Sequence, residues 1–169
     1  MKKGFTLLEL MIVLAIFTVI MGSIFTALSI GKNSFYTGSV QVEMQQEARK
    51  GLDRMVKELR QTNNFVIPSL PADDIFYNTI TFRLPVTDVN GYTNWTSDVT
   101  YSLGGLNGTQ LLRMTVNGTE ILANNINSIQ FRRTTSTPNV IDIRIQAVKN
   151  TLIGHTIQAP LNCQVNMRN

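Results

Sequence analysis

From Phe5 to Ile30 the chain runs for 26 residues with one charged side chain, that of Glu9. As a helix this segment would be roughly 39 Å long, which exceeds the hydrocarbon core of a bilayer of about 30 Å. It therefore predicts a membrane-spanning helix with some tilt. Lys2 and Lys3 precede it, and basic residues mark the cytoplasmic end of a span. We expect a single-pass chain with a cytoplasmic N-terminus and an exported C-terminal part.

A second stretch has the spacing of an amphipathic helix. Between Val40 and Asn63, apolar residues return every three or four positions and form one stripe that comprises Met44, Ala48, Leu52, Met55, Val56 and Leu59. We expect this stripe to pack on a sheet. The other positions are rich in charged residues, Glu58 among them, and we interpret these as a solvated face.

No residue obviously breaks the helix between these two stretches. Gly31 and Gly38 weaken it by about 1 kcal/mol each relative to alanine, and the next proline is Pro68. We therefore expect one helix from near Phe5 to about Asn63, roughly 88 Å long if it is continuous.

Beyond Asn64 the hydrophobic period changes to two, which is typical of strands with one buried face. Alternating runs occur at Ile80–Leu84, Val99–Leu103, Leu112–Val116, Ile129–Phe131, Ile141–Ala147 and Leu161–Met167. Asn117-Gly118 predicts a two-residue hairpin turn, and the region from Pro68 to Trp95 is expected to be rich in loops. The fold class is α+β: a long N-terminal helix, its second half packed on an antiparallel sheet with one wet face.

Composition narrows the function classes. Hydrophobic residues make up 43% of the chain and charged residues 15%, and the apolar excess lies at the N-terminus. The formal charge of +4 is mild and the basic residues form no stripe with aromatic ones, so nucleic-acid binding has little support. The single cysteine, Cys163, cannot form an internal disulfide, and we interpret it as a buried small hydrophobe on the apolar side of its strand.

No residue pattern suggests catalysis or metal binding. His155 is the only histidine, and neither a nucleophile nor a metal ligand is near it in sequence. Asp73 and Asp74 fall far short of the about six to eight oxygens that calcium takes, and we interpret them as a solvated turn. The sequence thus predicts no catalytic residue, no metal site and no cofactor, so a membrane-anchored enzyme has no support.

Two ordinary interpretations of the N-terminal segment compete. A secretory signal peptide has an apolar region of about 7–15 residues before a small-residue cleavage site, and this run is far longer. A plain membrane anchor fits the length but leaves Glu9 unexplained, because a carboxylate in a membrane helix costs a few kcal/mol and usually has a partner or a task. Physical reasoning alone favours the plain anchor.

A family resemblance changes this balance. The run from Lys2 to Ile16, KKGFTLLELMIVLAI, resembles the leader and N-terminal helix of type IV prepilins and pseudopilins. The shared features are a basic leader, Gly4 before the cleavage site, Phe5 after it, then a threonine, and Glu9 at the fifth position of the processed chain. The resemblance implies that a prepilin peptidase cuts between Gly4 and Phe5 and methylates the new amine of Phe5. It also implies that Glu9 pairs with the N-terminal amine of a neighbouring subunit and sets the axial register of a filament.

The resemblance also implies an organisation. Residues 1–4 would be a leader peptide, 5–30 the transmembrane half of the helix, 31–63 its amphipathic half, and 64–169 a globular β-rich head. The segment from Gln45 to Gln61 is similar to J-type minor pseudopilins of type II secretion and W-type minor pilins, which implies a place at or near the filament tip. The implied partners are the peptidase, other minor and major subunits, the inner-membrane assembly platform and membrane lipid.

The implied location is the inner (cytoplasmic) membrane, and later a periplasmic or extracellular filament. The main hypothesis is a structural subunit of a type IV pilus-like or type II secretion filament, without catalysis of its own. The alternative is a binding module, either a tip adhesin or a DNA-capturing subunit of a competence pilus. Exposed basic and aromatic residues gathered on the head would favour that alternative.

Overall fold

The computed structural model describes residues 6–63, 66–67, 69–87, 93–151, 154 and 156–168. The chain divides into two compact units, Met1–Val40 and Gln41–Asn169. One helix, α1 (Leu7–Leu59), supplies most of the described part of the first unit and the first element of the second. Gly22, Gly31 and Gly38 all lie within it, so the glycines do not interrupt the helix.

The helix ends a few residues before the expected Asn63. The N–H groups of Gln61 and Thr62 bond the carbonyl oxygens of Glu58 and Leu59 at 3.0 and 3.2 Å, which is the tighter spacing of a closing turn. The hydroxyl of Thr62 also donates to the Leu59 carbonyl oxygen at 2.9 Å. This side chain therefore satisfies a carbonyl that a further turn of helix would otherwise have used.

Among the residues described after α1, the elements are β1 (Ile80–Phe82), β2 (Pro85–Thr87), β3 (Thr93–Trp95), β4 (Val99–Gly104), the short 3-10 helix η2 (Leu106–Gly108), β5 (Gln110–Thr115), β6 (Gly118–Ala123), β7 (Ile126–Arg133), β8 (Val140–Asn150) and β9 (Thr156–Asn166). All strand pairs are antiparallel, as expected. The single sheet that we expected is instead a four-stranded sheet in the order β1-β4-β5-β6, a three-stranded sheet β7-β8-β9 and a hairpin β2-β3. The region expected to be loop-rich contains β1, β2 and β3.

The hairpin between β5 and β6 lies one residue earlier than the Asn-Gly signal suggested. Thr115 pairs with Gly118, so Val116 and Asn117 form the two-residue turn. Both have negative φ, and the positive φ of 136° falls on Gly118. Glycine adopts this backbone conformation without a Cβ clash, so it takes up the sharp change of direction at the start of β6.

The core of the second unit lies between α1 and the sheets. The predicted stripe is buried at Met44, Ala48, Leu52, Met55 and Leu59, while Val56 is half-buried. It meets inward residues that include Ile80, Phe82, Val99, Tyr101, Leu111, Ile129, Phe131, Ile141, Ile143, Ile145 and Val165. The rings of Phe82 and Tyr101 stack with centroids 5.7 Å apart. Burial of such side chains stabilises the fold by about 1.5–3 kcal/mol each relative to exposure.

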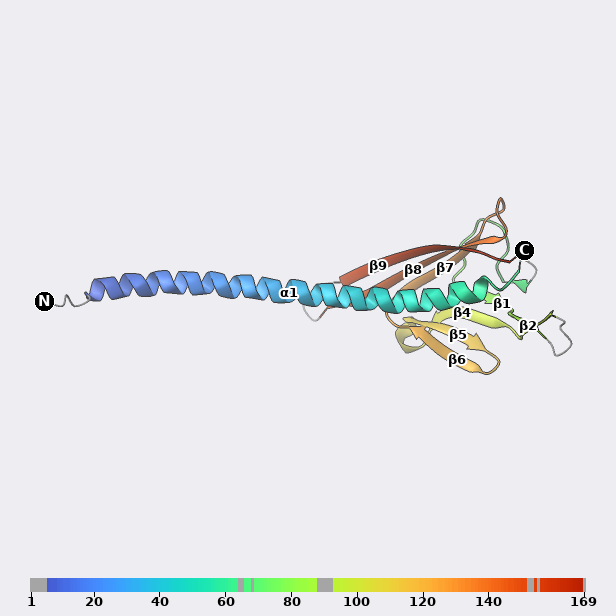
Figure 1. The fold of residues 1–169 in the computed structure, drawn as a ribbon, viewed down its shortest axis with the longest axis horizontal. Helices are drawn as coiled ribbons and strands as arrows, with labels where there is room; N and C mark the ends of the chain where they lie inside the picture. Colours follow the sequence, from blue (N-terminus) through green and yellow to red (C-terminus); the bar gives the residue numbers. More distant parts are fainter. Residues whose placement is uncertain are drawn as a thin grey trace. The chain divides into compact units, whose positions relative to one another are not determined.

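Within the second unit, α1 runs alongside both main sheets (Figure 1). Contacts from several of its turns attach it to them. Glu43 reaches Lys149 of β8, whereas Glu58 reaches Tyr101 of β4. At Gly51 the helix approaches β5 so closely that an added Cβ would lie 3.0 Å from Cδ2 of Leu111. The small residue therefore sets how near the helix comes to the four-stranded sheet.

Candidate functional site

The N-terminus of α1 has a reciprocal side-chain cap. The backbone N–H of Glu9 donates to Oγ1 of Thr6 at 3.3 Å, and Oε2 of Glu9 accepts from the backbone N–H of Thr6 at 3.1 Å. The Thr6 hydroxyl donates to the same carboxylate oxygen at 3.1 Å. Thr6 precedes the first helical residue and Glu9 is the third, which is the spacing of a capping box.

This cap gives the Glu9 carboxylate a local role. The first N–H groups of a helix have no partner inside the helix, and the N-terminal end of the helix dipole favours a negative charge. Oε2 of Glu9 therefore has two donors within its own chain even though its side chain is exposed. This contact was not predicted from the sequence, although the spacing of threonine and glutamate at positions 6 and 9 is its known signature.

The helix behind this cap presents an apolar surface. Every residue from Leu7 to Ile30 is exposed, with large side chains such as Leu7, Phe17 and Phe25 among them. By length and composition α1 can cross a membrane, and none of its most apolar window is buried within the protein. Exposed apolar surface of this extent is typical of a membrane or protein contact.

The two residues of the predicted cleavage site, Gly4 and Phe5, lie outside the described residues, as do Lys2 and Lys3. Of the predicted site residues, the structure thus describes Glu9 alone. The structure adds Thr6 to the site as the capping partner of Glu9, a role that was not predicted from the sequence.

In the second unit, Glu58, which was expected to lie on a solvated face of the helix, is the centre of a polar cluster. Glu58 is 7% exposed. Its carboxylate accepts hydrogen bonds from Tyr101 Oη at 2.8 Å, Arg113 Nε at 3.0 Å and Arg54 Nε at 2.9 Å. Burial alone would raise the pKa of Glu58, but these hydrogen bonds outweigh it and hold the pKa below its usual value. The same burial, together with the negative charge of Glu58, raises the pKa of the Tyr101 phenol.

The cluster is structural rather than catalytic in form. Both carboxylate oxygens of Glu58 accept hydrogen bonds from the protein, and Tyr101 is fully buried, so the carboxylate serves contacts within the fold. Arg54 lies on the same helix as Glu58, whereas Tyr101 of β4 and Arg113 of β5 lie 43 and 55 positions away from Glu58 in the sequence. No local pattern could have predicted the two contacts from the strands.

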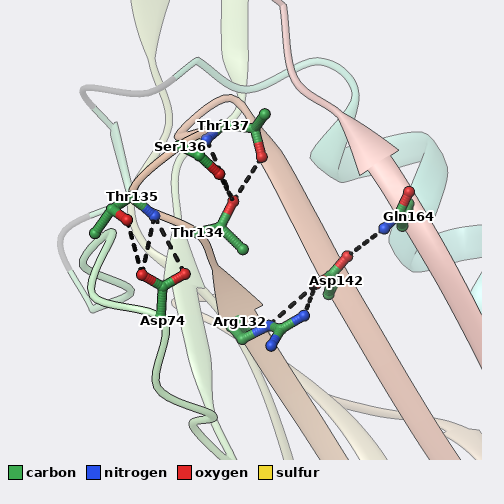
Figure 2. Close-up of polar contacts among 8 residues, drawn as sticks. All are labelled: Asp74, Arg132, Thr134, Thr135, Ser136, Thr137, Asp142 and Gln164. Atoms are coloured by element: carbon green, nitrogen blue, oxygen red, sulfur yellow. Dashed lines mark hydrogen bonds and ion pairs between the residues drawn. The ribbon is translucent and has the colours of Figure 1, made fainter.

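The predicted acidic turn at Asp73 and Asp74 serves the loop architecture. Asp73 accepts from the N–H of Ile75 at 3.1 Å and from the hydroxyl of Tyr77 at 2.5 Å. Asp74, in left-handed backbone geometry with φ of 65°, accepts from the hydroxyl of Thr135 at 2.8 Å (Figure 2). These contacts tie the segment before β1 to the loop between β7 and β8.

Near this loop, Arg133 is a buried cation held by carbonyl oxygens. It is 5% exposed, and its guanidinium donates to the Pro138 and Leu70 carbonyl oxygens at 2.9 and 2.8 Å. Burial lowers its pKa. Arg132, the neighbouring residue, points to the opposite face of β7 and binds Asp142, which also accepts from Gln164 (Figure 2).

Among the described residues, no group of three or more histidine, cysteine or acidic side chains could hold a metal ion. Cys163 is half-buried rather than buried as expected. His155 lies outside the described residues.

Comparison with known proteins identifies the N-terminal segment. Residues 1–25 match the prokaryotic N-terminal methylation motif. No curated protein and no solved structure matches the chain. The motif implies processing by a prepilin peptidase and assembly with other pilins, and together with the exposed apolar helix it indicates a membrane-anchored chain. The chain thus carries the prepilin-type methylation motif on a pilin-like α+β layout, which supports a place in the type IV pilin and pseudopilin family.

Proposed function

We propose that this protein is a structural subunit, a minor pilin or pseudopilin, of a type IV pilus-like or type II secretion filament. The observation that carries the proposal is the methylation motif at residues 1–25, which leads into a helix of membrane-spanning length with an exposed apolar surface. In this proposal the protein has no catalytic activity, and its task is to pack against other subunits.

Processing begins the proposed pathway. The chain sits in the cytoplasmic membrane with its N-terminus in the cytoplasm and its head exported, which agrees with Lys2 and Lys3 before the apolar segment. A prepilin peptidase cuts between Gly4 and Phe5 and methylates the amine of Phe5. The apolar helix remains on the protein, unlike a secretory signal, and the bilayer stores the subunit until assembly.

Glu9 is the proposed assembly residue. In the membrane its carboxylate is bonded to Thr6, which offsets part of the cost of burying a charge. Neutral donors do not cancel the charge, however, and a neighbour's N-terminal amine would do so. The hypothesis is that Glu9 exchanges a local cap for a charged partner, and that this pair fixes the axial register between subunits.

A position at or near the filament tip is the finer part of the proposal. It rests on the likeness of residues 45–61 to J-type pseudopilins and W-type minor pilins. Contacts at Glu43, Gly51 and Glu58 hold the second half of α1 on the sheets, so the head is a firmly connected body suited to subunit packing.

The test is the intact mass of the protein extracted from membranes of a host that makes a prepilin peptidase. We expect loss of Met1 to Gly4 and the gain of one methyl group. Gly4→Ala should leave the unprocessed chain, whereas Gly22→Ala, a glycine in open space within the helix, should be processed normally. A processed chain that starts beyond Ile30 would contradict the proposal and indicate an ordinary secreted protein.

A further inference from the structure

The outer face of the sheet β7-β8-β9 carries a polar pocket of about 320 Å³, within the second unit. On β8 every second residue from Ile141 to Ala147 is buried, so Asp142 and Arg144 point away from the core. The volume lies at the small end of the range of about 300–1,000 Å³ for ligand pockets. The polar side chains that line it are those of Arg132, Asp142, Arg144, Asn162 and Gln164. Charged and amide groups of this kind suit a polar ligand.

One ion pair lies in this pocket. Nη2 of Arg132 donates to Oδ2 of Asp142 at 2.6 Å, and Nε2 of Gln164 donates to Oδ1 of the same carboxylate at 2.8 Å (Figure 2). Asp142 is thus held by both neighbouring strands, and its charge offsets that of Arg132. Each carboxylate oxygen has two lone pairs, so Asp142 can still accept a hydrogen bond from a ligand.

Arg144 supplies a positive charge that no acidic side chain of the lining offsets. No described carboxylate lies within ion-pairing distance of its guanidinium. Asp73 and Asp74, in the segment before β1, accept from hydroxyl groups elsewhere in the fold and do not line the pocket. The lining therefore contains two guanidinium groups and one carboxylate, which leaves one positive charge for a ligand.

The guanidinium of Arg144 is held in a defined position by an aromatic ring. Its Cζ lies 4.3 Å from the centroid of the Phe76 ring, and that of Arg132 lies 4.7 Å from the same centroid. A planar guanidinium stacked in this way presents its N–H groups in the fork that matches a carboxylate. Asn162 is the partner of Arg144 across the strands, and its side-chain amide has no hydrogen bond within the described part of the chain. A charged fork and a free amide thus lie side by side.

We propose that this pocket binds an acidic sugar. Arg144 holds the carboxylate of the sugar, and the hydroxyl groups of the sugar bond Asn162 and Asp142. The presence of Asp142 favours this class of ligand, because its oxygens need a donor and a sugar hydroxyl supplies one. An inorganic anion or an acidic peptide side chain brings negative charge without such donors. This binding goes beyond the filament role and does not depend on it.

The test is a nuclear magnetic resonance titration of the full chain in detergent micelles with D-glucuronate, at constant ionic strength. We expect saturable shifts of the Arg144 Nε–H signal and of the Asn162 side-chain amide signals. D-Glucose, which has a hydroxymethyl group in place of the carboxylate, should bind at least about tenfold more weakly, and so should acetate, which has no hydroxyl groups. Equal binding of glucuronate and either control compound, or no shift at Arg144 and Asn162, would overturn the proposal.

Two pairs of variants assign the contacts. Arg144→Gln should weaken glucuronate binding at least about tenfold, whereas Arg49→Gln, which removes an exposed charge that does not line the pocket, should leave it unchanged. Phe76→Leu removes the ring beside Arg144 and should weaken binding by about two- to fivefold, while Phe76→Tyr keeps a ring and should retain binding. Unchanged binding in Arg144→Gln would overturn the proposal. The titration of the unaltered protein decides the matter even if a Phe76 variant unfolds.

Discussion

The hydroxyl of Tyr101 on β4 donates a hydrogen bond of 2.8 Å to Oε2 of Glu58 on α1. Arg113 of the adjacent strand β5 donates to both carboxylate oxygens at 3.0 Å. A buried carboxylate is costly without partners, and here it has a phenol and two guanidinium groups around it. The arrangement holds the last turns of α1 in a defined place on the four-stranded sheet.

Truncation of Glu58 should therefore destabilise the head strongly. Glu58→Ala leaves the buried Tyr101 hydroxyl and the half-buried Arg113 guanidinium without their acceptor, and we expect a loss of about 3–5 kcal/mol in the free energy of unfolding. Asp53→Ala, on the same helix but exposed and outside any ion pair among the described residues, should change it by less than about 0.5 kcal/mol. Urea denaturation followed by circular dichroism measures both, and equal effects would contradict a structural role for the cluster.

The stability of the folded protein should also fall at low pH because of Glu58. The folded-state pKa of Glu58 lies below its ordinary value of 4.5, so the unfolded chain binds this proton more readily. The contribution of Glu58 to stability is thus fully present above about pH 4.5 and is lost as the pH falls through the folded pKa. Glu58→Gln should flatten this fall in denaturation midpoints measured from pH 6 to about pH 3. The Glu58→Gln variant should still lose some stability as the pH falls, because the hydrogen bond from Tyr77 also lowers the pKa of Asp73.

Two substitutions at Glu9 separate its cap from its charge. Glutamine at this position can still accept from the N–H of Thr6, so Glu9→Gln keeps the capping box and removes the charge, whereas Glu9→Ala removes both. If a charged pair with a neighbour's amine drives assembly, both variants should be recruited poorly into filaments. Cross-linking between the N-terminal helices of adjacent subunits measures recruitment.

Cleavage provides the control for this experiment. The peptidase site, Gly4–Phe5, precedes Glu9, so both variants should be processed nearly normally, and membrane insertion should be unimpaired. Normal cross-linking in Glu9→Gln together with a defect in Glu9→Ala would assign Glu9 to helix capping instead. Normal cross-linking in both variants would remove the assembly role altogether.

The head should fold without the apolar segment. Every residue from Leu7 to Ile30 is exposed, so this segment contributes nothing to the buried core of residues 41–169. A fragment that starts at Lys32 should be soluble, with both helix and strand in its circular dichroism spectrum and a cooperative thermal transition. Aggregation of this fragment under all conditions would show that the anchor and the head are not separable.

Local patterns were sufficient for the helix and most strands. The stripe from Met44 to Leu59 repeats every three or four residues and indicates a helix. The alternation from Ile141 to Ala147 repeats every two residues and indicates a strand, before any tertiary contact is considered. The apolar run before Ile30 and the motif around Gly4, Phe5 and Glu9 are likewise local, because a peptidase and a bilayer both act on a short contiguous segment.

Tertiary structure was needed wherever the partner is distant in the chain. Glu58 resembles its charged neighbours in sequence, yet it is buried because Tyr101 and Arg113 come from strands more than forty residues away. The division into separate sheets depends on which strands pair, and hydrophobic alternation specifies a face of a strand without specifying its neighbours. Periodicity therefore determines which side of each element is buried, while the packing of elements decides which polar groups are buried with it.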